Sequence, residues 1–432
     1  MDFSAYLAIA IFLITYVLII SEKVHKTAAA LAGGCAMILC GVVKEEEALA
    51  AVDLEVIFLL CGMMIIVHFL AESGFFRYLA IRLAQMARGR PVPLLLLLCS
   101  GTAVLSAMVD NVTTVLLVAP VTFLITAAMG VSPIPYLIFE ALASNVGGTA
   151  TLIGDPPNIL IASATGLTFN DFLFNLTPVA AVCLIFTLGA AVWAIRGEAR
   201  VTADLRARIM EMDAPKAITD RKMLIKSTAV LGAVLAGFLM HGLLGVKPAS
   251  IALSGATALL VLTRAAPSKV FKAVEWPTLF FFIGLFMVIS GLVSTGVLER
   301  VAQGVLSLTG NSLLLTCMMV LWFGAIASAL VDNIPLTVTL IPVIKDIIPA
   351  IAASTNTSVA TVEAGLWWSL ALGVCLGGNG TIVGASANVV VVEIARTNGR
   401  EITFRQFLWY GLPVMLTTIV ICSVYVFLRY IF

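Results

Sequence analysis

A polar, glycine-rich stretch at residues 145–158 interrupts one of the long apolar segments of this chain. The apolar runs on either side, 134–144 and 159–164, are each too short to cross a bilayer, which takes about 20 residues in a helix. Backbone groups that leave a helix at membrane depth must be satisfied by protein or by a watery cavity. The stretch therefore predicts a transmembrane helix, near 134–166, that is broken at its middle and lines a binding site there.

The composition fixes the class of protein. Of the 432 residues, 61% are hydrophobic and 11% are charged, and the mean hydropathy is +1.10. Soluble proteins carry about 25% charged residues, so an integral membrane protein is predicted. The eight cysteines and three histidines show no metal-ligand spacing, and we expect no cofactor, no metal and no disulfide framework.

The first apolar run, 4–21, has no basic residue before it and no cleavage site after it, and Lys23 and Lys26 follow it. We therefore expect a first transmembrane helix there and not a signal peptide. Further full spans are predicted at 26–43, 54–72, 172–195, 224–243, 248–264, 278–295 and 408–430.

A second polar stretch, 375–388, predicts a second broken helix near 364–396. The glycines and polar residues of the two stretches match in order: Gly147, Gly148, Thr151, Gly154 and Asn158 match Gly377, Gly378, Thr381, Gly384 and Asn388. The matching extends along the chain, where Val24, Gly33, Val52, Gly62, Gly74, Asp110, Asn111 and Pro178 recur as Val246, Gly255, Val274, Gly284, Gly296, Asp332, Asn333 and Pro413. One duplicated unit is predicted, with a first repeat at 1–195, a linker at 196–223 and a second repeat at 224–432.

Two apolar segments, 91–130 and 311–350, carry Asp-Asn pairs at their centres. Each segment is either two full spans or a helical hairpin whose turn stops inside the membrane, and the polar turns favour the hairpin. Each repeat then crosses the membrane an odd number of times, which inverts the second copy. The predicted fold is an all-α, inverted-repeat elevator-type transporter with about 10 transmembrane helices, two re-entrant hairpins and two broken helices.

The charge distribution predicts the orientation. In this topology most Lys and Arg residues gather on one side, in the turn near 22–26, in the linker and in the loops 73–90, 264–275 and 396–405. The positive-inside rule then predicts an inner (plasma) membrane protein with a cytoplasmic linker and both termini outside.

Four ionisable residues inside apolar segments are candidates for proton coupling. Asp110 and Asp332 lie at the hairpin turns, and we expect two unpaired carboxylates that load and release a proton. Their alternative role is to cap the helices that follow the turns. Asp155 either caps the second half of its broken helix or carries a proton, and Glu140 lies in the first half of the same helix.

The polar residues and glycines of the turns and breaks are candidates for binding a small solute or ion, because helix termini, hydroxyls and amides suit a polar solute. Some of them must instead satisfy the broken backbone. Cys375 is expected to be packing, with a thiol ligand to a soft solute as the alternative. The candidates are Asp110, Asn111, Thr113, Thr114, Asn145, Gly147, Gly148, Thr149, Thr151, Asp155, Asn158, Asp332, Asn333, Thr337, Gly377, Gly378, Asn379, Thr381, Ser386 and Asn388.

Three motifs carry a resemblance: Asp-Asn-Val-Thr-Thr-Val-Leu-Leu from residue 110, Gly-Gly-Thr-Ala-Thr-Leu-Ile-Gly-Asp-Pro-Pro-Asn from residue 147, and Gly-Gly-Asn-Gly-Thr-Ile-Val-Gly-Ala-Ser-Ala-Asn from residue 377. Together they resemble the ArsB/NhaD branch of the ion transporter superfamily, above all its ArsB-type and pigmentation P-protein-like members. The resemblance covers essentially the whole chain. It implies an elevator fold and efflux of arsenite or antimonite coupled to protons.

One departure from related families bears on the substrate. The related dicarboxylate symporters carry Ser-Asn-Thr at their hairpin turns, where this chain has Asp110-Asn111-Val112 and Asp332-Asn333-Ile334. Two carboxylates would repel a dianion, so a neutral or cationic solute is favoured.

The function expected first is proton-coupled efflux of arsenite or antimonite by a secondary active transporter, which is not an enzyme. A Na⁺/H⁺ antiporter of the NhaD type and a P-protein-like transporter of an anion or small solute are the alternatives. An intramembrane aspartyl protease and a passive channel are weaker ones, because a protease needs two aspartates together and these lie on symmetric hairpins. The expected partners are the solute, protons or Na⁺, and the lipid bilayer. A second copy of the chain and an ATPase subunit are left open, and nucleic acid is not expected.

Overall fold

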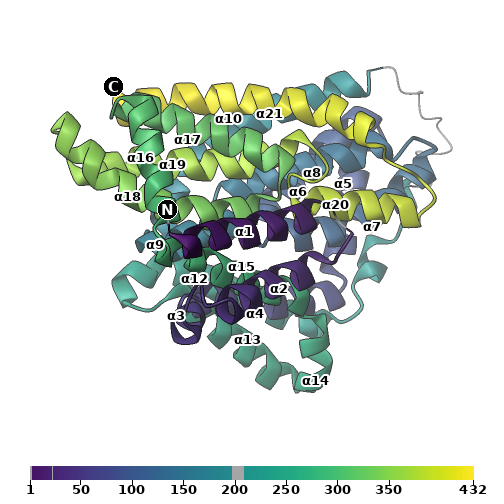
Figure 1. Ribbon diagram of the computed structural model, residues 1–432. Coiled ribbons are helices and arrows are strands. Elements are labelled where there is room, and N and C mark those ends of the chain that lie inside the picture. The colour runs from purple at the N-terminus through teal and green to yellow at the C-terminus, as the bar shows by residue number, and fades with distance from the viewer. Residues whose placement is uncertain (1, 22, 197–208) are drawn as a thin grey trace.

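The computed structural model describes residues 2–21, 23–196 and 209–432, which fold into helices joined by short turns (Figure 1). The predicted linker lies partly outside these ranges, at 197–208. The helices of the first half are α1 (Phe3–Ser21), α2 (Lys26–Leu39), α3 (Glu45–Ala50), α4 (Leu54–Glu72), α5 (Phe75–Met86), α6 (Pro91–Met108), α7 (Asn111–Met129), α8 (Ile134–Thr149), α9 (Pro156–Thr165) and α10 (Phe169–Ala194). The second half has the short helix η1 (Ala214–Ala217), α12 (Arg221–Leu244), α13 (Pro248–Thr263), α14 (Pro267–Val270), η2 (Phe271–Ala273), α15 (Trp276–Ser294), α16 (Val297–Thr309), α17 (Leu313–Leu330), α18 (Asn333–Thr355), α19 (Val359–Gly377), η3 (Gly378–Gly380), α20 (Ser386–Thr397), α21 (Phe404–Val426) and η4 (Phe427–Ile431).

The order of the helices in the first half recurs in the second. The hairpin α6–α7 corresponds to α17–α18, and the broken helix α8–α9 corresponds to α19–α20. Local signals recur with them, because Gly74 and Gly296 take left-handed backbone angles, with φ of 83° and 67°, at the start of α5 and α16. Capping boxes at Thr168 and Thr403 begin α10 and α21. The same local sequence thus starts the same element twice.

The all-helical membrane fold is confirmed. Within the described ranges, 11 helices are long and apolar enough to cross a membrane, and the four arms of the two hairpins are among them. Several predicted boundaries are wrong. Helix α2 ends at Leu39 and not at 43, α10 begins at Phe169 and not at 172, and α21 begins at Phe404 and not at 408. Helix α12 begins at Arg221 and not at 224, because the Asp220 carboxylate accepts hydrogen bonds from the first backbone amides of the helix.

The helices form two groups. We call α1–α4 with α12–α15 the framework unit and α6–α10 with α17–α21 the carrier unit; the framework unit lies in the lower part of Figure 1 and the carrier unit in the upper part. In the framework unit, α2 packs on α15 and α4 packs on α13, so each repeat packs against the other. A Cβ at Gly62 would lie 2.7 Å from the carbonyl carbon of Ala252, and one at Gly284 would lie 2.5 Å from that of Ala30. The repeated glycines therefore permit two close helix crossings.

The two hairpin turns meet inside the carrier unit, as the re-entrant hairpin predicts. The backbone N–H of Asn111 donates to the carbonyl of Gly154 at 3.1 Å, and the side chain of Asn333 donates to the Asp155 carboxylate at 3.1 Å. The second arm of each hairpin packs on the second half of the other repeat's broken helix, α7 on α20 and α18 on α9. Both turns are thereby held at one break.

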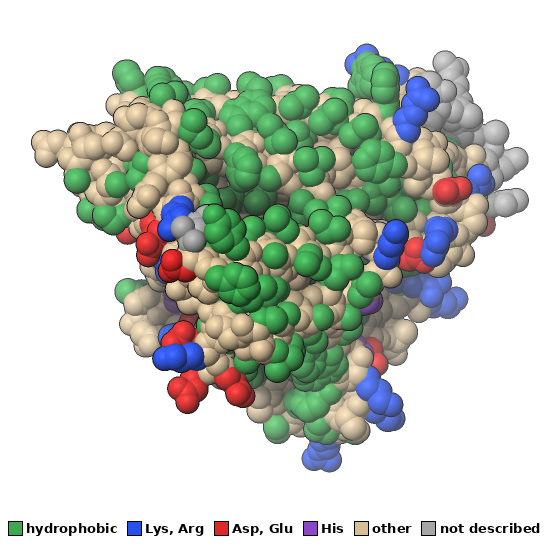
Figure 2. All heavy atoms as spheres, viewed as in Figure 1, with side chains coloured by type: hydrophobic (Ala, Val, Ile, Leu, Met, Phe, Trp, Pro, Cys, Tyr) green, Lys and Arg blue, Asp and Glu red, His purple; other side chains and the backbone are tan. Residues whose placement is uncertain are grey.

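The surface is apolar over most of the face in view, and its charges gather at the two ends (Figure 2). Basic side chains cluster at the right, at the end that holds α5, α7, α14 and α20. Both termini lie towards the opposite end, at the left of Figure 1, and α3, whose first turn is Glu45, Glu46 and Glu47, lies on the same side. This is the charge asymmetry on which the sequence-based orientation depends.

Candidate functional site

The two hairpin aspartates begin the second arms of their hairpins. The Asp110 carboxylate accepts a hydrogen bond from the backbone N–H of Thr113 at 2.8 Å, and that of Asp332 accepts one from Ile334 at 3.2 Å. Both residues are nearly buried, with 9% and 8% of their surface exposed. The capping role is therefore present, and each carboxylate keeps acceptor capacity beyond its cap.

Both aspartates line one cavity of about 390 Å³ at the boundary of the two units. The framework unit contributes the turn before α2 and the first residues of α15, and the carrier unit contributes both hairpin turns and the first residues of α9 and α20. The polar lining comprises His25, Lys26, Asp110, Glu275, Thr278, Asp332 and Ser386. With its acids ionised, this lining sets three carboxylates against one ammonium.

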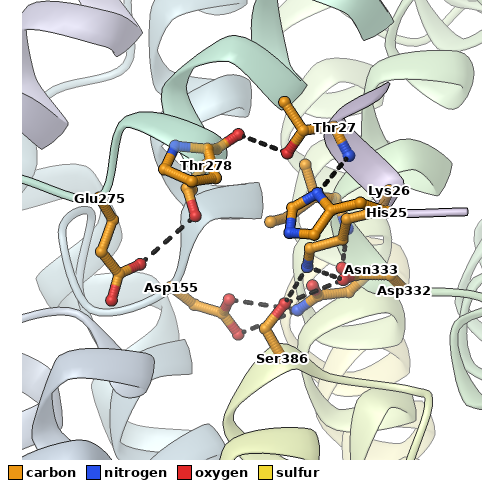
Figure 3. Close-up of polar contacts among 11 residues, drawn as sticks. His25, Lys26, Thr27, Asp155, Glu275, Thr278, Asp332, Asn333 and Ser386 are labelled. Carbon is orange, nitrogen blue, oxygen red and sulfur yellow. Dashed lines mark hydrogen bonds and ion pairs between the residues drawn. The ribbon is translucent and has the colours of Figure 1, made fainter. Parts of the chain in front are cut away.

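The ammonium of Lys26 forms an ion pair that sequence reasoning missed. Its Nζ lies 3.1 Å from Oδ2 of Asp332 and donates to Oγ of Ser386 at 2.9 Å (Figure 3). The Ser386 hydroxyl in turn donates to the same Asp332 oxygen at 2.9 Å. The expectation that both hairpin carboxylates are unpaired is wrong for Asp332. The sequence feature that could have indicated this ion pair is the position of Lys26 at the start of an apolar run. The second repeat has Pro248 at the matching position.

The hydroxyls and amides of the breaks mostly satisfy the broken backbone. Thr151 Oγ1 donates to the carbonyl of Ala107 at 2.6 Å, and Thr381 Oγ1 does the same to Ala329. The Asn158 side-chain amide donates to the carbonyls of Thr149 and Thr151, and Asn388 donates to those of Gly378 and Thr381. Each repeat thus satisfies the backbone carbonyls at its helix break with the same set of side-chain hydrogen bonds.

The glycines of the breaks face protein backbone and not the cavity. A Cβ at Gly148 would lie 2.5 Å from the carbonyl oxygen of Gly154, and one at Gly378 would lie 2.8 Å from that of Gly384. At Gly147 and Gly377 it would meet the backbone of the first hairpin arm, at 2.1 Å and 2.5 Å. These glycines let the hairpins and breaks approach closely, so they shape the site without lining it.

A chain of asparagine amides joins the two repeats behind the cavity. Asn145 accepts from the side-chain amide of Asn111 at 3.1 Å. It donates to the side-chain oxygens of Asn379 at 2.9 Å and Asn388 at 3.0 Å. All four residues are buried. Asn145 therefore holds a hairpin and both broken helices in one network.

The second repeat replaces this centre by a different pair. Cys375 occupies the position that matches Asn145, and its thiol contacts Oδ1 of Asn158 at 3.7 Å. The Asn333 amide donates to the carboxylate of Asp155, whose matching position in the second repeat is Ala385. Asp155 stands at the N-cap position of α9 but makes no side-chain cap bond, so its alternative role as a cap is not realised. Cys375 is fully buried and does not line the cavity.

Glu140 lies apart from the cavity. Its Oε1 accepts a hydrogen bond from Thr122 Oγ1 at 2.6 Å, while its Oε2 is buried and has no partner within the described ranges. Of the candidate residues, Asp110, Asp332 and Ser386 line the cavity. Most of the other polar candidates are buried behind it as its supporting structure.

Asn145→Ala is expected to lower both stability and flux. The substitution leaves amide groups of Asn111, Asn379 and Asn388 without their partner, at about 1–3 kcal/mol for each buried group that stays unsatisfied. Thermal unfolding of the purified variant, followed by circular dichroism, measures the loss. Cys375→Ala, the matched change in the other repeat, removes a thiol whose bond to Asn158 is weak, and should unfold close to wild type. Equal stability of the two variants would contradict this assignment.

Comparison with known proteins supplies the family. The family model described as citrate transporter, CitMHS, matches residues 16–373. An uncharacterized transporter of Mycobacterium tuberculosis is 42% identical over 427 residues, covering 98% of both chains. The human P protein is 32% identical over 509 residues, which cover 98% of this chain and 60% of that protein.

The fold is also found among solved structures. The YdaH transporter of Alcanivorax borkumensis, whose crystal structure is described as having an unusual topology, matches with a TM-score of 0.60 and 15% identity. The match covers 100% of this chain and 99% of that one. The cavity between two units, the duplicated hairpins and these similarities agree: the chain is a membrane transporter of the citrate transporter (CitMHS) family, within the ion transporter superfamily.

Proposed function

We propose that this protein is a proton-coupled secondary active transporter of a small neutral or cationic solute, with arsenite and antimonite as the first candidates. The observation that carries the proposal is the cavity in which Asp110 and Asp332 lie together with one basic partner, Lys26. A carboxylate that moves across a membrane interior without compensation costs several kcal/mol, so a proton or another cation must bind before it moves. Solute and proton then alternate at one site.

The charge of the lining supports this solute class. Asp110, Asp332 and Glu275 face Lys26 alone, so a free polyanion would meet net repulsion. Arsenous acid is neutral near pH 7 and escapes this repulsion. A monovalent cation such as Na⁺ is attracted to the same lining, so Na⁺/H⁺ antiport is the nearest alternative. A P-protein-like anion would have to enter with a neutralising cation.

The family match favours citrate as a second candidate. Free citrate at neutral pH is a polyanion, which this lining disfavours. A complex of citrate with a divalent cation carries less charge and presents a metal ion to the carboxylates. Citrate is therefore expected to be transported, if at all, as such a complex.

The proposed orientation places the cavity on the cytoplasmic side. It is lined at the turn before α2 and at the start of α15, which belong to the basic end of the molecule. At the other end of the molecule, Asp53 and residues of α9, α15 and α18 line a cavity of about 470 Å³ that no hairpin turn lines. There Ser163 of α9 donates to the Asp53 carboxylate of the framework unit. We propose that this is a cytoplasm-facing conformer, that both termini lie outside, and that movement of the carrier unit past the framework unit exposes the site to the outside.

An intramembrane protease has less support. The placement of the two aspartates on symmetric hairpins predicted that they lie apart, yet both line one cavity. An aspartyl dyad shares a proton between its two carboxyls. Here Asp332 is instead bonded to Lys26 and Ser386, which suits ion coupling and not a shared proton.

The test is solute flux in proteoliposomes under an imposed pH gradient. Arsenite, antimonite, Na⁺, citrate and citrate with Mg²⁺ are assayed in parallel against empty liposomes. The proposal expects accumulation of arsenite or antimonite that a protonophore collapses. Accumulation of Na⁺ alone, or of citrate only with Mg²⁺, would replace the first candidate by the corresponding alternative. Accumulation of none of them would overturn the proposed coupling.

A further inference from the structure

Lys26 is the one cation bonded to a hairpin aspartate in the described part of the chain. Its partners come from two other elements, since Asp332 lies at the turn between α17 and α18 and Ser386 is the first residue of α20. The three side chains point at one another and close a triangle (Figure 3). Every edge of the triangle is a hydrogen bond of 2.9–3.1 Å, so the lysine is positioned for this carboxylate.

The arrangement is absent from the other repeat. Pro248 stands where Lys26 stands, and Pro156 stands where Ser386 stands. Within the described ranges, Asp110 takes part in no ion pair, although it lines the same cavity. The lysine is thus not a general feature of hairpin turns in this chain and distinguishes the two aspartates.

The ion pair crosses the boundary between the two units. Lys26 begins α2 of the framework unit, and its ammonium lies 5.2 Å from the ring centre of Phe281, which belongs to α15 of the same unit. This cation–π contact holds the ammonium on the framework side. Asp332 and Ser386 belong to the carrier unit, so movement of that unit must separate them from the lysine.

We propose that Lys26 is a fixed cation that displaces the travelling proton from Asp332 on the cytoplasmic side, an inference that rests on the proposed proton coupling. When the carrier unit arrives with Asp332 protonated, the ammonium takes up the position beside the carboxyl group. The carboxyl O–H bond breaks, the proton passes to water in the cavity, and the carboxylate is left paired with Lys26. Before the carrier unit leaves, the exchanged solute must neutralise Asp332 in place of the proton, because a buried carboxylate without its cation is strongly disfavoured.

Other titratable groups near Asp332 also affect how readily it binds a proton. The cavity also holds His25, Asp110 and Glu275, while Tyr16 of α1 and Asp155 of the first break lie close enough to interact electrostatically with Asp332. Among these groups the carboxylates favour a bound proton on Asp332, and Lys26 opposes it. Removal of the lysine therefore predicts protonation of Asp332 at higher pH.

The experiment measures protonation of Asp332 directly. A hydrophobic carbodiimide modifies protonated carboxyl groups, and mass spectrometry of the peptide that contains Asp332 gives the extent of labelling at each pH. For Lys26→Gln we expect the midpoint of labelling to rise by at least about one pH unit, as loss of a nearby opposite charge predicts. Lys26→Arg should keep the wild-type midpoint, and Lys23→Gln, which removes an exposed lysine outside the cavity, should do so too.

A second variant guards against a folding defect in Lys26→Gln. Ser386→Ala keeps the lysine but removes the hydroxyl that bridges it to Asp332, and should raise the midpoint by a smaller amount. Midpoints equal to wild type in folded Lys26→Gln or Ser386→Ala protein would overturn the role of Lys26. The labelling does not depend on a transported solute, so it separates this inference from the proposed function. A raised midpoint without pH-driven flux would support the lysine's effect on Asp332 and reject the coupled transport.

Discussion

Asp110→Asn is expected to abolish proton-driven accumulation of solute while downhill exchange continues. Asp110 lines the cavity and takes part in no ion pair among the described residues, so its charge depends on a proton or on the solute. Asn cannot bind and release a proton, but its side-chain oxygen can still accept the bond from Thr113 that caps α7. The loss should therefore concern coupling and not folding.

Everted vesicles with an imposed pH gradient measure this loss. A difference of one pH unit sustains up to about tenfold accumulation for each proton exchanged, because a tenfold ratio corresponds to about 1.4 kcal/mol. The variant's ratio should fall to about one, with counterflow of labelled solute retained. Asp155→Asn and Glu140→Gln are the comparisons, since both carboxyls are buried and lie outside the cavity lining. If Asp110→Asn accumulates solute as well as wild type does, Asp110 does not carry the coupling proton, and Asp155 is the next residue to test.

Gly148→Leu is expected to eliminate transport in any assay, downhill exchange included. An added Cβ would lie 2.5 Å from the Gly154 carbonyl oxygen and 3.2 Å from the Ser106 hydroxyl. The Gly154 carbonyl also accepts the backbone N–H of Asn111, so displacing it moves the first hairpin turn and the Asp110 carboxylate beside it. Overpacking costs about 1–3 kcal/mol, and a branched side chain at this position exceeds a simple methyl.

Gly378→Leu should act in the same way on the second break, where the Gly384 carbonyl oxygen would lie 2.8 Å from the new Cβ. Gly189→Leu is the matched control, because a Cβ there meets no atom within 4 Å. Folding of the purified protein is checked by size-exclusion chromatography before flux is measured. Near-normal flux by Gly148→Leu would show that the break tolerates displacement of its own backbone.

The order of the helices and their breaks could be predicted from the sequence, because few backbone conformations are possible for polar and glycine-rich segments inside a membrane. A Gly-Gly pair followed by Asp155-Pro156-Pro157 cannot continue a lipid-facing helix, so the break was predictable and lies between α8 and α9. Polar Asp-Asn pairs inside apolar segments predicted the hairpin turns, which meet inside the protein. The matched spacing of glycines predicted the recurring order of the helices, because each glycine permits a turn or a close helix crossing at its position.

The tertiary structure decided which polar groups meet, because hydrogen-bond and ion-pair partners here come from distant parts of the chain. Asn145 bonds to Asn388 of the other repeat, and Asn333 bonds to Asp155. The pairing of Lys26 with Asp332 joins the first residue of α2, in the framework unit, to a hairpin of the carrier unit. An apolar sequence pattern predicts that a polar residue lies inside the membrane. It does not predict which of several asparagines or carboxylates that residue contacts in the folded protein. The sequence therefore determined the elements and the carboxylates at their turns, and the packing of one repeat on the other decided which of those carboxylates has a counter-ion.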